Sequence, residues 1–367
     1  MSYITALGVA NPPHRIPQSE AANFMIRAMN LNEEEARRLR ALYKMTGIEN
    51  RYSVISDYKS EQNFTFYPNT STLEPFPTTG QRMALYREHA SMLSVSAAAR
   101  TFQFVKELQP HEITHLIVVS CTGMYAPGLD IDLIKLLHLK GSTNRTAINF
   151  MGCYAAFNGL KLADHIVKSN ANAKVLLICT ELCSIHFQRE KTDDNFLANA
   201  LFADGAAALI VEPSPRPGLQ FKIDSFFSDI ISSGANDMAW AIGDFGFEMK
   251  LSSYVPEIIR SGIKGLAQSL LSHRGGSIQS ADYFAIHPGG RKILEVIEEE
   301  LKISYRQNQF AYEVLRQFGN MSSPTVLFVL NLLKATLSQS DHGKSVMSLA
   351  FGPGLTLESM LLEVHYS

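Results

Sequence analysis

The sequence predicts an α/β fold in which helices cover a mostly buried mixed sheet and two related halves share one plan. Apolar, β-branched runs of strand length alternate with longer helical segments. Several of these runs lack polar alternation, which is typical of strands covered on both faces. A strand ending at an unusual residue, a buried helix and two closing strands occur around Cys153 and again around His287. The length of 367 residues suits a duplicated unit, and we place the halves at 1–213 and 214–367.

The first half begins with a short strand, "ITALGVANPP", which prolines close. We predict helices over residues 20–46 and 91–108, and an ordered, turn-rich surface excursion over 63–80. The segment after Cys153 is apolar nearly all round at its start, which predicts a helix in the centre of the molecule. Short apolar runs predict four buried strands, "ITHLIVVS", "RTAINF", "KVLLICTEL" and "AAALIVEP".

The second half repeats this plan. The strand "DYFAIHPGG" ends in glycines, and the helices "RKILEVIEEEL" and "PTVLFVLNLLKATL" follow it. Two strands close the chain, "SVMSLAFGPG" and "LTLESMLLEV". If the two halves lie side by side, their strand ends and helix starts meet at one shared centre.

Composition excludes several classes of protein. Hydrophobic residues make up 46% and charged residues 19%, as in a globular enzyme, and the net charge of −2 comes without any basic cluster that would bind nucleic acid. The N-terminus lacks the pattern of a signal peptide, and no apolar run approaches the ~20 residues that span a membrane. The cysteines show no metal-binding spacing, which favours free thiols in a reducing cytoplasm and no metal site.

Cys153 is the first candidate for chemistry. A lone cysteine is usually a buried structural residue. Cys153, however, follows Gly152 at the point where an apolar run becomes a helix. A helix N-terminus stabilises a thiolate and lowers the pKa of the thiol. We therefore interpret Cys153 as a candidate nucleophile.

Three other places could assist it. His287 ends an apolar strand in "FAIHPGG", and a Cys–His pair is the minimal activated nucleophile. Asn320 in "FGNMSSP" is either a turn or helix-cap residue or an amide donor to an oxyanion. The segment "AFGPG", residues 350–354, is either a plain turn or a rigid loop that shapes a pocket wall.

These motifs together resemble one family. The segments "GCYAAFNGLKLA", "LFADGAAALIV", "IHPGGRKILEVIE", "FGNMSSPTVLF" and "FGPGLTLESMLLE" are similar to the chalcone synthase superfamily, the type III polyketide synthases. The resemblance runs from "GVANP" to the C-terminus and includes the family's spacing between His287 and Asn320. It implies a thiolase-like, five-layered αβαβα fold, a homodimer, and a catalytic triad of Cys153, His287 and Asn320.

The resemblance also implies a reaction. A starter acyl group moves from coenzyme A to the cysteine, the histidine and asparagine stabilise the enolate that malonyl-CoA forms on losing CO2, and this carbanion attacks the acyl group. Acyl-CoA and malonyl-CoA are then substrates, and neither cofactor nor metal is needed. For coenzyme A binding, the resemblance implies cations on an early helix, and Arg38 matches one such position. Ala41 and Met45 stand at the other two positions, so we expect Arg40 and Lys44 to substitute for them. Gly289 and Gly290, which allow close approach of the backbone, complete the expected coenzyme A site. A solvated helix face explains the three cations nearly as well.

Departures from the family pattern concern the substrate. Phe202 keeps one gatekeeper phenylalanine, Met249 replaces a second, and Trp240, near a position often held by glycine, would narrow the cavity. The small side chains of Cys121, Ala126 and Cys183 together resemble those of bacterial members that take fatty acyl-CoA starters. This resemblance predicts a tunnel for an alkyl tail. It also predicts a few malonyl extensions and an alkylpyrone or alkylresorcinol product. The predicted pocket comprises Cys121, Ala126, Cys183, His186, Phe202, Trp240, Met249, Ser322, Phe351 and Pro353.

Other functions stay open on the residues alone. The substitutions could simply repack the core, leaving a short or aromatic starter or malonyl-CoA itself. A ketoacyl-ACP synthase shares the fold and the three residue types but takes carrier-protein substrates. A cysteine hydrolase fits the Cys–His pair without malonyl-CoA.

Overall fold

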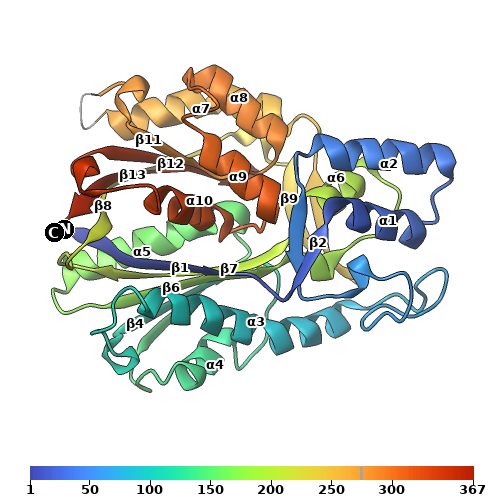
Figure 1. The fold of residues 1–367 in the computed structure, drawn as a ribbon, viewed down its shortest axis with the longest axis horizontal. Helices are drawn as coiled ribbons and strands as arrows, with labels where there is room; N and C mark the ends of the chain where they lie inside the picture. The colour runs from blue at the N-terminus through green and yellow to red at the C-terminus, as the bar shows by residue number, and fades with distance from the viewer. Residues whose placement is uncertain (273–275) are drawn as a thin grey trace.

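A computed structural model of the chain describes residues 1–272 and 276–367, and its central feature is one sheet of nine strands (Figure 1). The strand order is β11-β12-β13-β8-β1-β7-β6-β4-β5. The bounds are β1 (Ser2–Ala10), β4 (His115–Ser120), β5 (Asn144–Asn149), β6 (Val175–Leu182), β7 (Asp204–Glu212), β8 (Leu219–Ile230), β11 (Tyr283–Ile286), β12 (Ser345–Gly352) and β13 (Thr356–Tyr366).

Two small antiparallel pairs flank this sheet: β2 (His14–Pro17) with β3 (Asn50–Ser53), and β9 (Met238–Gly243) with β10 (Gly246–Leu251). The helices are α1 (Gln18–Ala28), α2 (Glu33–Met45), α3 (Thr79–Phe102), α4 (Leu129–Leu136), α5 (Ala155–Ser169), α6 (Asp193–Leu201), α7 (Val255–Leu271), α8 (Arg291–Leu301), α9 (Gln309–Phe318) and α10 (Thr325–Lys334). No helix of the described part is long and apolar enough to cross a membrane.

The sheet bends into two layers, because only a short ladder joins its halves. Ser2–Ile4 of β1 pair with residues 221–223 of β8, and the strands then diverge. Helices α5 and α10 lie between the two layers, α7 and α8 cover the β11-β12-β13-β8 side, and α3 and α4 cover the other (Figure 1). This is the five-layered α/β arrangement that the family resemblance implied, with the helix after Cys153 at its centre as the residues predicted.

Three predicted elements differ in detail. Residues 20–46 form two helices, since the chain breaks at Asn30, which has a φ of +48°, and Asn32 caps the second helix. The helix predicted over 91–108 spans Thr79–Phe102, with the Thr78 side chain capping its start, so both of its ends lie earlier than predicted. The run "RTAINF" is a strand but not a buried one: β5 forms an open edge of the sheet, and all its residues except Ile148 are exposed.

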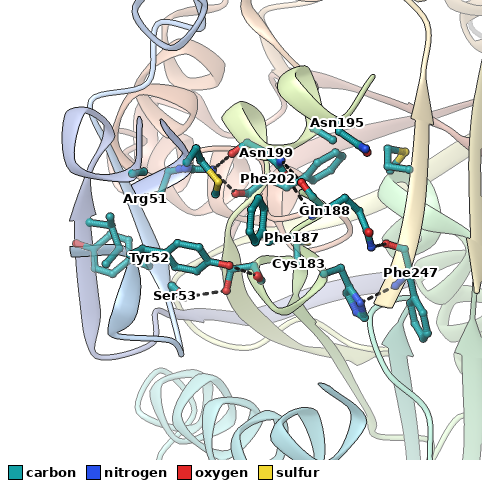
Figure 2. A pocket seen from close by; sticks show the side chains of 18 of the residues that line it. Arg51, Tyr52, Ser53, Cys183, Phe187, Gln188, Asn195, Asn199, Phe202 and Phe247 are labelled. Carbon is teal, nitrogen blue, oxygen red and sulfur yellow. Dashed lines mark hydrogen bonds between the residues drawn. The ribbon is translucent and has the colours of Figure 1, made fainter. Parts of the chain in front are cut away.

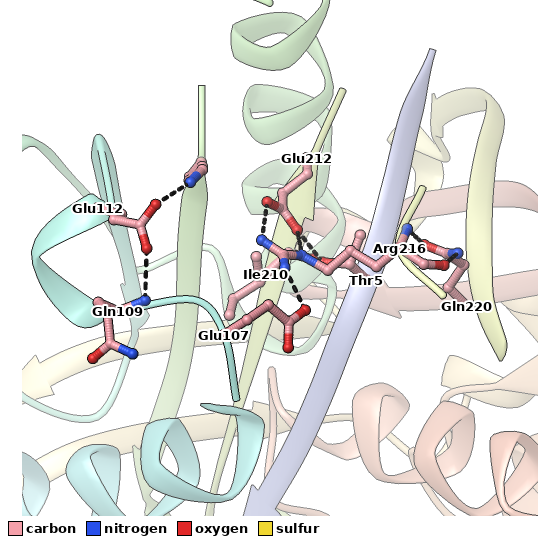
Figure 3. Close-up of polar contacts among 9 residues, drawn as sticks. Thr5, Glu107, Gln109, Glu112, Ile210, Glu212, Arg216 and Gln220 are labelled. Atoms are coloured by element: carbon pink, nitrogen blue, oxygen red, sulfur yellow. Dashed lines mark hydrogen bonds and ion pairs between the residues drawn. The ribbon is translucent and has the colours of Figure 1, made fainter. Parts of the chain in front are cut away.

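A buried ion pair lies where the first half of the chain ends. The Glu212 carboxylate accepts hydrogen bonds from Arg216 Nε at 2.5 Å and Nη2 at 2.8 Å, and from Thr5 Oγ1 at 2.8 Å (Figure 3). Arg216 also donates to Glu107, in the segment that follows α3, at 2.6 Å. The Glu212 side chain is only 8% exposed, so the arginine supplies the counter-charge that water cannot. The predicted boundary after residue 213 falls between these two partners.

Replacing Arg216 with alanine is expected to lower the free energy of unfolding by about 3 kcal/mol, because Glu212 then stays buried without its cation. Arg260→Ala is the matched control, since it removes ion pairs to three glutamates at the surface, where such pairs contribute little. Chemical denaturation of both variants measures the difference. An equal loss of unfolding free energy in Arg216→Ala and Arg260→Ala would show that the burial of Glu212 does not make its ion pair more important than the surface pairs.

Candidate active site

Cys153 is placed by a tight turn between β5 and α5. Phe150 and Gly152 both have positive φ, +60° and +78°, and a single 3₁₀ turn then carries Cys153 to the start of α5. A Cβ atom at Gly152 would lie 2.4 Å from Cδ of Pro353, so the glycine is required by both the backbone angle and the space. The turn thus holds Cys153 at a helix N-terminus, as predicted, with its side chain buried.

His287 and Asn320 reach the same place from the second half. The His287 N–H donates to the Leu349 carbonyl at 2.8 Å, which fixes the end of β11 against β12. The backbone of Asn320 is held by the end of α6 and the residues just after it. Its N–H donates to the Leu201 carbonyl at 2.9 Å, and its carbonyl accepts from Ala203 N–H at 2.8 Å. Its Oδ1 lies 3.9 Å from the Cys153 sulfur. Three separate segments therefore converge, as the two-halves prediction required.

Hydrogen bonds orient the Asn320 amide, among them a longer one of 3.4 Å that Oδ1 accepts from the Thr325 hydroxyl. Oδ1 accepts from the Ser322 backbone N–H at 2.8 Å, and Nδ2 donates to the Gly289 carbonyl at 3.3 Å. The second N–H of this amide can donate to a substrate oxygen, so the arrangement can stabilise an oxyanion.

Burial disfavours the charged forms of both reactive candidates, the Cys153 thiolate and the His287 imidazolium. It raises the pKa of the Cys153 thiol to about 12, although interactions with the Ser322 and Asn320 side chains oppose the shift, and it lowers the pKa of His287 to about 3. Neither ring nitrogen of His287 has a hydrogen-bond partner among the described residues. At neutral pH the site therefore favours a neutral thiol and a neutral imidazole, and a thiolate forms there only together with a neighbouring imidazolium.

One cavity brings most of the predicted site residues together. Including its mouth, it encloses about 520 Å³. Besides Cys153, His287 and Asn320, the predicted residues that line it are Cys121, Cys183, Phe202, Trp240, Met249, Ser322, Phe351, Pro353 and Gly289. This lining mixes apolar walls with a few polar groups, as ligand sites usually do.

Two predicted pocket residues do not line this cavity. Ala126 lies in a different hollow with Tyr86 and Ala147. The Tyr86 ring packs where a Cβ atom of Gly123 would stand, and the chain after Gly123 runs to that hollow instead. His186 lines a second cavity rather than the first. The predicted tunnel wall at Ala126 is thus absent from the cavity of the single chain.

The second cavity adjoins the first and encloses about 610 Å³ with its mouth (Figure 2). Arg51 closes one part of it and donates through Nη1 to the carbonyls of Asn199 and Phe202, at 2.6 and 2.8 Å. Its walls are mostly apolar or aromatic, and they include Ile16, Ala21, Met25, Tyr52, Phe187 and Phe247. Four residues belong to both cavities: Cys183, Phe202, Trp240 and Met249.

Sequence reasoning missed Glu181, a fully buried acid behind the cavity. Its Oε2 accepts from Cys121 N–H at 2.9 Å and from the Thr122 hydroxyl at 2.7 Å, and its Oε1 accepts from the Ser323 hydroxyl at 2.6 Å. Burial raises the pKa of this carboxyl. Glu181 therefore fixes the chain at Cys121 and Thr122. The signal was a single acidic residue inside the apolar run "KVLLICTEL".

The predicted coenzyme A residues lie at the surface. Arg38 pairs with Glu34 at 2.5 Å, and Arg40 and Lys44 are exposed on α2. The end of α2 reaches α8, since a Cβ atom at Gly47 would lie 3.5 Å from Cδ of Arg291. Gly290 precedes α8, and Gly289 lines the first cavity. The exposed cations on α2 and the cavity wall are thus connected through the start of α8.

Comparisons with known proteins agree with this architecture. The family model described as "Chalcone and stilbene synthases, N-terminal domain" matches residues 1–215, and the corresponding C-terminal model matches 222–365. The chain is 30% identical to the "Alpha-pyrone synthesis polyketide synthase-like Pks18" of Mycobacterium tuberculosis, over 99% of this chain and 91% of that protein.

Two solved structures of polyketide synthases have the same fold as this chain. PKS-I from the brown alga Ectocarpus siliculosus matches with a TM-score of 0.90 and 31% identity, covering 99% of this chain and 98% of the other. The C-terminal type III polyketide synthase domain of Steely1 from Dictyostelium matches with a TM-score of 0.90 and 27% identity, covering 99% of each chain. Because two consecutive domain models of one family cover it almost end to end, the chain belongs to the chalcone and stilbene synthases and is a type III polyketide synthase, an acyl-condensing transferase.

Proposed function

We propose that Cys153 carries the growing chain and that His287 and Asn320 form and use the malonyl enolate. In the first step Sγ gives its proton to His287 and attacks the thioester carbonyl of an acyl-CoA, and coenzyme A leaves as a thiol with that proton. The turn at Gly152 and the position of Cys153 at the start of α5 support this role.

In the second step Asn320 Nδ2 and a ring N–H of His287 donate to the thioester carbonyl of malonyl-CoA. The carbon–carbon bond to the malonyl carboxylate breaks and CO2 leaves. The electron pair of that bond stays on the remaining thioester as an enolate, which these two donors stabilise. The enolate carbon attacks the acyl thioester on Cys153 and releases the thiolate. The free ring nitrogens of His287 and the oriented Asn320 amide support this assignment.

The starter in this proposal is a long-chain fatty acyl-CoA, and the single observation that carries it is the second cavity. Apolar and aromatic side chains form most of that cavity's wall, alongside polar residues such as Arg51, Gln188 and Asn199, and four wall residues are shared with the cavity of Cys153. Among those four, Cys183 has the smallest side chain, so the alkyl tail would pass beside it. Burying methylene groups in such a space favours a long tail by about 0.8 kcal/mol each.

The proposed product is an alkylpyrone, formed after a few malonyl extensions, with an alkylresorcinol as the other mode of ring closure. The name of the Mycobacterium tuberculosis relative, which refers to alpha-pyrone synthesis, supports the pyrone. Trp240 lines the cavity of Cys153 and leaves less room for a long polyketide.

The test is mass spectrometry of products from labelled malonyl-CoA and a ladder of acyl-CoA starters from acetyl to stearoyl. Pyrones or resorcinols from the long starters alone would support the proposal. Products only from short or aromatic starters, or from malonyl-CoA by itself, would overturn the long-chain assignment while keeping the reaction. Activity only with acyl groups on a carrier protein would favour a ketoacyl-ACP synthase.

Coenzyme A binding on α2 gives a separate prediction. We expect the Arg40→Ala, Lys44→Ala double variant to raise KM for acyl-CoA about tenfold with little change in kcat, because exposed cations there would bind phosphates and not the reacting atoms. Glu33→Gln, at an exposed position on the same helix, is the control. Steady-state kinetics at two salt concentrations checks it, and an unchanged KM would mean that α2 is only a solvated face.

We also propose that the protein is a homodimer that pairs through β5. Strand β5 is an exposed edge strand, and an uncovered edge is a template for pairing with another strand. Met124 and Leu136 nearby are 40% and 43% exposed. Sedimentation equilibrium is expected to give twice the chain mass of 40.7 kDa. A mass that stays at one chain at all concentrations would contradict the dimer.

A further inference from the structure

The hairpin of β9 and β10 stands apart from the large sheet. Within the described residues its two strands pair only with each other. Met249 and Trp240 are direct cross-strand partners, and both line the two adjoining cavities. The position of this hairpin therefore decides how the two cavities connect and how much room each offers.

Two side chains fasten the hairpin to successive carbonyls of the segment after β4. Trp240 Nε1–H donates to the Cys121 carbonyl at 2.7 Å. His186 bonds the Thr122 carbonyl through Nε2 at 2.7 Å, and its Nδ1 accepts the Phe247 backbone N–H at 2.9 Å. Since Glu181 holds Cys121 N–H and the Thr122 hydroxyl, the hairpin is tied to a segment that is itself fixed.

The hydrogen bonds define the state of His186. A backbone N–H donates to Nδ1, so this nitrogen carries no proton, and the proton on Nε2 donates to the carbonyl. Burial lowers the pKa of the imidazole to about 3, which keeps it in this neutral form. The ring stacks on Phe247 at 4.2 Å between centroids and 11° between planes, and it contacts the edge of Trp240 at 5.6 Å.

The tip of the hairpin is held separately. Thr79 N–H donates to the Asp244 carbonyl, and the Thr79 hydroxyl accepts from Gly246 N–H, both at 2.8 Å. Gln188 Nε2 donates to the carbonyl of Phe245 and to that of Phe247, each at 3.2 Å, and Figure 2 shows Gln188 beside Phe247. With the tip anchored in this way, His186 and Trp240 control the part of the hairpin that faces the cavities.

We propose that His186 is a positioning residue that sets, together with Trp240, where the β9–β10 hairpin stands over the two cavities and so how long a chain the enzyme builds. Both of its ring nitrogens are occupied, and it lines the second cavity but not the cavity of Cys153, so it acts through the hairpin and not on the reacting atoms. The chain-length part rests on the proposed function, whereas the placement of the hairpin does not.

Trp240 reports on the hairpin directly, because it is the only tryptophan of the chain. His186→Phe keeps the stacking and removes both hydrogen bonds, and His186→Asn keeps an acceptor for Phe247 N–H and loses the reach to Thr122. Each lost bond is expected to shift the hairpin's opening equilibrium about fivefold. Acrylamide quenching of Trp240 should therefore rise most in His186→Phe and less in His186→Asn. His165→Phe, at an exposed position of α5, is the control and should match the wild type.

The second readout is the ratio of products with different numbers of malonyl units. A partly unfolded variant lowers the total yield but not this ratio, so a merely structural role would leave it unchanged. We expect the ratio to shift toward longer products in His186→Phe and partly back in His186→Asn.

Unchanged quenching in a folded His186→Phe variant would overturn the proposal, and so would loss of the fold in both His186 variants, because a positioning residue should be replaceable. Changed quenching with an unchanged ratio would overturn the chain-length part. If the wild type makes no long-chain product at all, the starter assignment fails while the quenching experiment still decides the role of His186.

Discussion

Replacing Cys153 with alanine is expected to lower polyketide formation by about 10⁴-fold or more, because the variant has no sulfur to carry the acyl group. Decarboxylation of malonyl-CoA should continue, since that step uses His287 and Asn320. Product analysis by mass spectrometry and release of labelled CO2 measure the two activities separately. Cys153→Ala is thus expected to decarboxylate malonyl-CoA without forming polyketide, whereas the wild type couples the two steps.

Cys179→Ala is the matched control. Cys179 is fully buried in β6 and lies in the core, outside the lining of either cavity. This variant should lose some stability and keep its rate per folded molecule. Full product formation by Cys153→Ala, or equal loss in both variants, would mean that Cys153 is only one of several buried thiols.

Asn320→Asp is expected to lower kcat by about 10²–10³-fold. The aspartate keeps the oxygen that accepts the hydrogen bond from the Ser322 N–H, so the backbone at residues 320–322 is expected to keep its conformation. It loses the Nδ2–H donor and puts a carboxylate beside the developing enolate. The loss should therefore appear in kcat rather than in KM.

Asn331→Asp makes the same change on α10, away from the cavity lining, and should leave kcat unchanged within about twofold. A loss confined to KM in Asn320→Asp would show that the residue binds substrate and does not stabilise the enolate. An equal loss in both variants would point to a general effect of added negative charge.

The sequence predicts the fold and the meeting of three residues for physical reasons. Gly152 before Cys153 and Pro288 after His287 stop the chain at the ends of strands, and strand ends from two similar halves meet at the centre. Burial in strand β5 was predicted wrongly, because an apolar run looks the same at a sheet edge as inside the sheet.

The walls of the site were harder to predict. Ala126 is close to Cys121 in sequence, but the packing of Tyr86 against Gly123 decides which hollow it enters, and that contact spans distant elements. His186 was predicted as a pocket residue and lines the second cavity, but its hydrogen bonds also tie two backbone segments that no sequence pattern links. Glu181 was missed because its partners lie far from it along the chain.

The most direct measurement is peptide mass spectrometry of the enzyme after mixing with palmitoyl-CoA and then with malonyl-CoA. The account predicts an acyl adduct on the peptide that contains Cys153, and its disappearance, with release of an extended product, once malonyl-CoA is added. An adduct on another cysteine, or an adduct on Cys153 that malonyl-CoA does not discharge, would contradict it.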